Sequence, residues 1–208
     1  GPQFFQAFSQ TEREALAEVL NKGGPETMAI LSGIHQTFGP DTPRVMKELT
    51  KDAPEAATIG WMINAGASPQ AVKDAADALA LRRTDDFKPI SPPASEARSQ
   101  AISVVGTTFR ALPQAEQKAI DMANLLYEIR ARRKGIDPKA PDMDLWQQGL
   151  REALGENTDP RTGDVYGGIV EQGGIWSSKY RQPIVIPPNM KQDAIDDVIG
   201  AIRMTDLI

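Results

Sequence analysis

The chain has 208 residues, of which 40% are hydrophobic and 25% are charged, as is typical of a globular protein and not of a disordered one. It contains no cysteine, which excludes a disulfide framework, a thiolate nucleophile and a cysteine-based zinc site. Its 28 acidic and 23 basic residues give a net charge of −5, which argues against nucleic acid as a partner.

The first two residues, Gly1 and Pro2, resemble the remnant of a protease cleavage site. We therefore expect the chain to be a fragment of a larger protein. No basic-then-apolar secretory leader follows these residues. No apolar run approaches the roughly 18 residues that a membrane-spanning helix needs, so no membrane span is expected.

Residues 1–83 are predicted to form an N-terminal cluster of short helices. Thr11 and Glu14 make a capping-box pattern that predicts the first helix start, and prolines and glycines mark the later starts and ends. The fourth helix, which starts near Pro54, is apolar on nearly every side, so Trp61 is predicted to be buried. The turns are short, which favours roughly antiparallel packing of neighbouring helices.

Residues 84–94 form a predicted connection between this cluster and a second unit. Pro89, Pro92 and Pro93 forbid a continuing helix here and favour extended backbone. Helical patterns then resume, so residues 95–208 are predicted to be a separate helical unit.

The second unit is predicted to hold the longest helix, at residues 113–134, and a small β meander at residues 156–189. A meander is expected because short β-prone pieces recur there, and a structureless stretch of this length is unusual in a compact domain. An amphipathic closing helix at residues 190–208 is predicted to cover the meander with its apolar face. The predicted fold class is therefore mainly α, a multi-helix array with a small β meander near the C-terminus.

Candidate catalytic and metal-binding residues are few. His35 is the only histidine, so a histidine-centred triad or a two-histidine metal site would need another chain, and a helix-surface role is expected. The segment 159–164 lacks the ligand pattern of a calcium loop and is predicted to be a turn. Asp193, Asp196 and Asp197 are expected to favour a helix dipole and not to act in acid–base catalysis. No catalytic, cofactor or metal site is therefore predicted.

A basic cluster at the end of the longest helix is a candidate partner contact. It contains Arg130, Arg132 and Arg133. These cations are expected chiefly to complement the negative end of the helix dipole. Contact with a phosphate or a nucleic acid is the alternative, so the three arginines are kept as a possible partner contact.

Three phenylalanines near the N-terminus, Phe4, Phe5 and Phe8, form a second candidate contact. On a free terminus they would make an apolar patch for a partner. On a fragment they would more simply belong to a helix that packs within the chain or against a part that was removed. The second interpretation is favoured.

The C-terminal third carries Ala153-Leu-Gly155, then Tyr166-Gly-Gly168, then an apolar run into Pro187-Pro188 and an acidic amphipathic segment. This order of features resembles a recurrent segment near the end of very large phage and prophage proteins. Such proteins are virion-associated, often act at genome ejection, and in some cases carry a lytic transglycosylase domain elsewhere. The resemblance implies a location in the virion.

The sequence departs from any catalytic transglycosylase pattern, because it has neither a Glu-Ser motif start nor a Gly-Leu-Met-Gln segment. The resemblance therefore implies a non-catalytic structural or interaction module, whose partners are other segments of the parent chain or other virion proteins. One alternative is a divergent peptidoglycan-cleaving domain with an acid such as Glu116 or Glu152 in a groove. Another alternative is a bacterial helical adaptor that binds a partner helix.

Overall fold

The computed structural model describes residues 7–105 and 113–158, and the short pieces 161–163, 165–167, 170–172, 175–177 and 183–185. Eight α-helices lie in this part of the chain, which confirms the predicted mainly α class. No helix among the described residues is long and apolar enough to cross a membrane.

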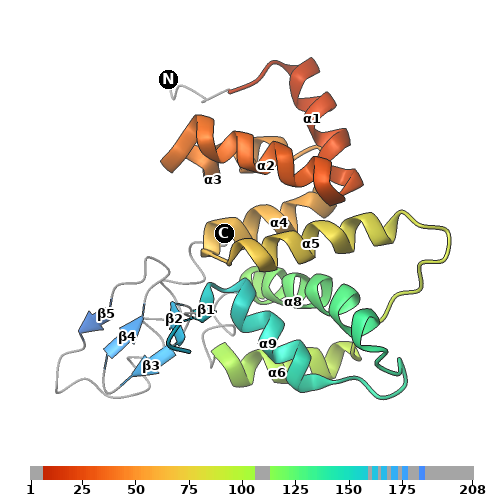
Figure 1. The fold of residues 1–208 in the computed structure, drawn as a ribbon, viewed down its shortest axis with the longest axis vertical. Coiled ribbons are helices and arrows are strands. Elements are labelled where there is room, and N and C mark those ends of the chain that lie inside the picture. The colour runs from red at the N-terminus through yellow and green to blue at the C-terminus, as the bar shows by residue number, and fades with distance from the viewer. Residues whose placement is uncertain are drawn as a thin grey trace.

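The helices stack in three layers, which Figure 1 shows from top to bottom. The middle layer contacts both of the others, because α5 packs against α2 on one side and against α8 on the other. The first layer consists of α1 (Gln10–Lys22), α2 (Gly24–Phe38), the 3-10 turn η1 (Gly39–Asp41) and α3 (Thr42–Leu49), the middle layer of α4 (Pro54–Ala65) and α5 (Pro69–Arg82), and the third of α6 (Ala94–Val105), α8 (Pro113–Lys134) and α9 (Met143–Ala153).

The first helix begins with a capping box, although not at the predicted residues. The Ser9 hydroxyl accepts a hydrogen bond from the Glu12 backbone N–H at 3.2 Å, and the Glu12 carboxylate accepts one from the Ser9 N–H at 3.1 Å. The prediction of Thr11 and Glu14 was therefore wrong by two residues. The same S/T-x-x-E pattern occurs earlier, and Phe8 anchors the chain there by packing edge-on against Phe38.

The junction of α1 and α2 depends on a glycine. Gly23 has φ of +71°, a conformation that side chains rarely adopt. A Cβ at this position would lie 2.4 Å from the Ala80 nitrogen and 2.5 Å from the Ala76 oxygen, both in the backbone of α5. Because Gly23 has no side chain, its backbone can pack directly against the backbone of α5, which brings the first layer close to the middle layer.

One cluster of buried apolar side chains runs through all three layers. Hydrophobic burial on this scale is the main favourable term in folding. The largest fully buried members are Trp146, Tyr127, Leu20, Met46, Leu49, Ile59, Met62, Leu79, Met122, Leu125 and Leu126.

The tryptophan at the centre of the core is Trp146 on α9, which is 0% exposed. The prediction that Trp61 is buried was wrong, because Trp61 lies partly exposed at the edge of the cluster. On α4 the inward positions are taken by Ile59 and Met62, which are three residues apart and therefore share a helix face. A helix that is apolar on every side does not reveal in its sequence which face is buried.

The proline-rich connection follows α5 and leads into α6. Pro92 is buried, and the Pro93 carbonyl accepts a hydrogen bond from the Ala97 N–H at 3.0 Å in the first turn of α6. The division of the chain at residues 84–94 stays a prediction. The helices before and after this connection nevertheless pack together, since α5 and α8 lie against each other.

Short antiparallel strands follow α9. In the described residues β1 pairs with β2, while β3, β4 and β5 form a three-stranded sheet in that order. Much of the predicted meander at 156–189, and all of the predicted closing helix at 190–208, lie outside the described residues and stay predictions. The strands are β1 (Glu156–Thr158), β2 (Val165–Gly167), β3 (Val170–Gln172), β4 (Ile175–Ser177) and β5 (Pro183–Val185).

Candidate functional site

A groove of about 770 Å³ lies between α6 and α8. The proline-rich connection contributes Ser91 and Pro92 to its lining. Its walls combine apolar and polar side chains from both helices, as binding sites commonly do. The helical lining includes Ser95, Arg98, Ser99, Ile102, Glu116, Gln117, Ile120 and Asn124.

A carboxylate in this groove is paired with an arginine. Glu116 on α8 is only 9% exposed, and its Oε1 lies 2.7 Å from the Nε atom of Arg98 on α6, which is 65% exposed. The pair joins the two walls of the groove by a charge-assisted hydrogen bond. The structure therefore places Glu116 in a groove, as the enzyme alternative requires, but with its charge already matched by Arg98.

The helix α9 is hydrogen-bonded to both helices that line this groove. The indole N–H of the buried Trp146 donates to the Asn124 side chain at 2.9 Å, and Asn124 lines the groove. Gln147 on α9 also donates to Gln100 on α6. Because α9 is bonded in this way to both walls, the groove is largely pre-formed.

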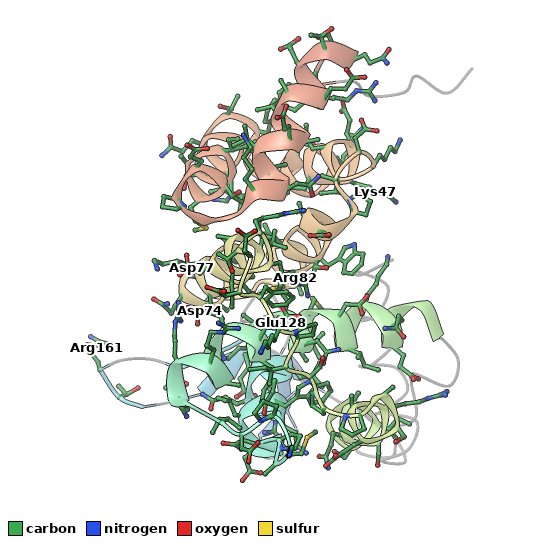
Figure 2. The ribbon with its side chains drawn as sticks, turned by 90° about the vertical axis from the view of Figure 1, so that its right-hand side faces the viewer. Lys47, Asp74, Asp77, Arg82, Glu128 and Arg161 are labelled. Atoms are coloured by element: carbon green, nitrogen blue, oxygen red, sulfur yellow. The ribbon has the colours of Figure 1, made fainter. Side chains whose placement is uncertain are left out.

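A second set of charged residues joins α5 to α8, and Figure 2 shows Arg82 and Glu128 meeting between these helices. Arg82 donates two hydrogen bonds to the Glu128 carboxylate, at 2.8 and 2.7 Å. This two-point geometry is the strongest and most directional form of the pair. The bonds to Glu128 outweigh burial and raise the pKa of Arg82 above its ordinary value.

Asp74 on α5 is the centre of a larger group of ion pairs. It is 6% exposed and accepts hydrogen bonds from Arg130 at 3.1 Å and from Arg133 at 2.8 Å. Burial acts to raise the pKa of Asp74, but the hydrogen bonds from Arg133 and Arg130 outweigh it and hold the pKa below its ordinary value. Arg130 also pairs with Glu152 on α9, so this group links three helices.

The predicted basic cluster is therefore engaged mainly inside the chain. Arg130 is 13% exposed and binds two carboxylates, while Arg133 binds Asp74 and the more exposed Asp77. Arg132 is exposed in the last turn of α8, where the predicted dipole interaction applies. A small hollow of about 260 Å³ lies beside Arg130, Arg133 and Glu152.

The predicted phenylalanine cluster is described only at Phe8, because Phe4 and Phe5 lie outside the described residues. Phe8 packs against Phe38 with ring centroids 5.7 Å apart. The buried carboxylate of Glu48 on α3 accepts hydrogen bonds from the backbone N–H groups of Ala7 and Phe8, at 3.0 and 3.3 Å. Glu48 thus ties the start of the described chain to the first layer.

The remaining predicted site residues are placed as follows. His35 is exposed on α2, as expected for a helix-surface histidine. Asp193, Asp196 and Asp197, like most of the segment 159–164, lie outside the described residues. No group of three or more histidine, cysteine, aspartate or glutamate residues that could hold a metal ion occurs in the described part of the chain.

One carboxyl group, that of Glu156 on β1, has a raised pKa. Burial is the main cause, and Arg151 partly opposes it. Glu156 lines neither the groove nor the small hollow. Glu156 therefore does not contribute its carboxyl group to either hollow.

Several of these residues carry no local signal in the sequence. Asp74 and its arginine partners are 56 and 59 residues apart, and Arg82 and Glu128 are 46 apart. Only the helical spacing of charged residues on α5 marks one of its faces as polar. The pairing partners follow from packing and not from a motif.

Comparison of the chain with models of known protein families, with curated proteins and with solved structures finds no match. The resemblance to large phage proteins therefore stays an expectation drawn from residues 153–208 of the sequence. The fold defines a layered, mainly α-helical protein with a mixed polar and apolar groove.

Proposed function

We propose that this chain is a structural and interaction module of a large phage-derived virion protein. It would act by shape and contact, on other segments of its parent chain or on other virion proteins. The motifs in residues 153–208 support this origin. Within the proposal, residues 156–189 form a small β meander that the segment 190–208 covers.

The observation that carries the proposal is the way in which the chain uses its charged groups. Ion pairs between helices involve the side chains of Asp74, Arg82, Glu128 and Arg130. The groove carboxylate of Glu116 is likewise paired with Arg98. Such cross-links favour a rigid scaffold over a reactive centre. A rigid scaffold with a pre-formed groove is suited to binding.

The virion location can be tested directly. An antibody raised against this chain should label purified phage particles induced from the strain that carries the gene. Particles from a strain in which the coding region of this chain is deleted are the control. Purified particles that contain none of the protein by immunoblot and by mass spectrometry would refute the proposal.

A second candidate function, cleavage of peptidoglycan, is favoured by one observation, the nearly buried Glu116 in the groove. We expect no activity, because general acid–base catalysis needs a protonated group at the reacting bond. The ion pair with Arg98 instead favours the charged form of the Glu116 carboxylate. Purified protein should leave the turbidity of a peptidoglycan suspension unchanged. Clearing that is abolished by Glu116→Gln, but not by Glu26→Gln on the exposed surface of α2, would establish the enzyme instead.

A further inference from the structure

The groove between α6 and α8 already holds one guanidinium group against a nearly buried carboxylate. Both helices belong to the third layer (Figure 1) and contact each other. Arg98 lies on α6 with most of its side chain in solvent, and its Nε atom is 2.7 Å from Oε1 of Glu116 on α8. The carboxylate is therefore fixed in the wall of the groove, while its cation reaches it from the surface.

Glu116 differs from the other two nearly buried carboxylates that form ion pairs in the described part of the chain. The arginine bound to Glu128 is 27% exposed, and one of the arginines bound to Asp74 is 13% exposed. Arg98 is 65% exposed, so solvent screens its attraction to Glu116 much more strongly. Among the described residues, Glu116 therefore lacks the largely buried cation that each of the other two carboxylates has.

The apolar part of the groove suits the hydrocarbon stem of a long cationic side chain. Ile102 on α6 and Ile120 on α8 both line the groove. Arginine and lysine commonly lay their stems along such apolar surface. A volume of about 770 Å³ falls in the range of pockets that enclose a drug-sized ligand, so the groove has room for neighbouring residues of a peptide as well.

The polar part of the groove offers acceptors besides the carboxylate. Ser95 and Ser99 are one helical turn apart on α6 and contribute hydroxyl oxygens. Gln117 donates its side-chain nitrogen to Asp121 at 2.9 Å, which leaves its carbonyl oxygen as an acceptor. A guanidinium group carries five N–H donors in a planar fork, whereas an ammonium group carries three. Several acceptors in one groove therefore favour arginine over lysine.

From these observations we propose that the groove binds an arginine of a partner protein, whose guanidinium group displaces Arg98 and pairs with Glu116. The proposal rests on the function as an interaction module and names the chemistry of the partner.

The exchange is favoured by the difference in exposure between the two cations. The pair with Arg98 contributes little, because one partner is mostly in solvent, and the released Arg98 regains its side-chain freedom. An arginine that enters the groove pairs with Glu116 where less solvent screens the two charges. The net charge of −5 also attracts a basic segment to the chain.

The experiment is a titration of the full chain into a labelled pentapeptide, followed by fluorescence anisotropy at physiological ionic strength. The peptide has capped ends and one central arginine, flanked on each side by a leucine and a terminal glycine. A second peptide carries citrulline in place of the arginine, which keeps the shape of the side chain and removes its charge. The arginine peptide should bind about tenfold more tightly, because only its side chain pairs with the buried carboxylate.

Two variants with opposite expected effects make the result decisive. Glu116→Gln removes the charge of the carboxylate, so the two peptides should bind it with equal affinity. Arg98→Ala removes the competing cation, so the arginine peptide should bind roughly threefold to tenfold more tightly than it binds the unchanged protein. Arg132→Ala is the matched control, because it removes the same charge from the exposed last turn of α8 and should leave binding unchanged.

A third variant tests the groove without altering the ion pair. Ser99→Phe places a large side chain at an exposed position that lines the groove, and should abolish binding of both peptides. It decides the question together with Arg98→Ala if Glu116→Gln does not fold. The proposal is overturned if the arginine peptide does not bind, if the citrulline peptide binds equally well, or if Arg98→Ala fails to tighten binding. Binding that survives Ser99→Phe, or a preference for arginine that survives Glu116→Gln, would overturn it too.

The outcome is separable from that of the proposed function. If the antibody labels virions but the arginine peptide does not bind, only the groove loses its role. If the peptide binds as described but virions contain none of the protein, the assignment to a virion fails and the groove remains an arginine-binding site.

Discussion

The two sides of α5 hold their neighbours by different means. Toward α2, α5 offers small side chains and backbone, against which Gly23 packs at a distance that excludes even a methyl group. Toward α8 it offers Asp74 and Arg82, whose charges are matched by arginines and a glutamate of the third layer. Both contacts are tight, but only the second depends on ionisation. The comparison separates shape from charge as ways of fixing the position of one helix.

The contrast has consequences for specificity and for stability. Close packing around Gly23 is insensitive to salt and pH, because it involves no titratable group. Buried ion pairs lose much of their Coulombic gain to desolvation, so their main effect is to disfavour alternative registers of α5 on α8. We therefore expect the close packing at Gly23 to contribute more to the free energy of unfolding. The ion pairs between α5 and α8 should respond more strongly to salt and pH.

The largest effect is expected at the shape-based contact. Gly23→Ala should lower the free energy of unfolding by on the order of 4 kcal/mol, because it adds backbone strain to a steric clash with α5. Urea melts followed by circular dichroism measure this. Gly33→Ala on α2 is the control, since no atom lies within 4 Å of the added Cβ, and it should stabilise the helix by about 0.5–1 kcal/mol. Equal effects at the two glycines would contradict the close approach at Gly23.

A smaller loss is expected at the charge-based contact. Asp74→Ala should cost about 3 kcal/mol, because it leaves the partly buried Arg130 with one carboxylate fewer. Asp77→Ala, which also removes a carboxylate from Arg133, should cost less than about 1 kcal/mol, because Asp77 is 26% exposed. The same melts measure both variants. A larger loss for Asp77 would mean that burial does not control these ion pairs.

The smallest expected effect is a change in the acid sensitivity of the protein. The lowered pKa of Asp74 adds stability that is fully present above the ordinary aspartate pKa of about 3.9, and that is lost as the pH falls through the lower folded-state pKa. In urea melts over a pH series, stability should therefore fall below about pH 4. Asp74→Asn should flatten this fall, whereas Gly33→Ala should leave its shape unchanged. If the stability of Asp74→Asn falls with pH in the same way as that of the unchanged protein, other carboxylates cause the loss of stability.

The helix boundaries were the most predictable part of the fold. The helix α8 begins at Pro113 and ends at Lys134, as the proline at its start and Gly135 after its end predict. Ser68 caps α5 as its sequence indicates, and its side chain accepts a hydrogen bond from Ala71. These features depend on neighbours in the sequence, and their signals are therefore local.

The site was much less predictable, for a physical reason. The pairing of Asp74 with Arg130, and the approach of Lys118 to Trp61, depend on how helices cross in three dimensions. Trp61 and Trp146 both lie in helices with apolar residues, yet Trp146 is fully buried while Trp61 lies partly exposed at the edge of the core. Sequence periodicity shows that a helix has an apolar face, but it does not show which other helix packs against that face.

The connection between α5 and α6 has a consequence for the connectivity of the chain. Asp85 and Asp86 are exposed in a turn, and the contacts of α5 with α8 do not pass through this turn. Breaking the backbone there would remove a covalent link while leaving the complementary surfaces intact. The segments before and after the turn would then be held together by non-covalent contacts, among them the ion pairs of Asp74 and Arg82 with residues of α8. The same surfaces would allow two copies of the chain to exchange halves.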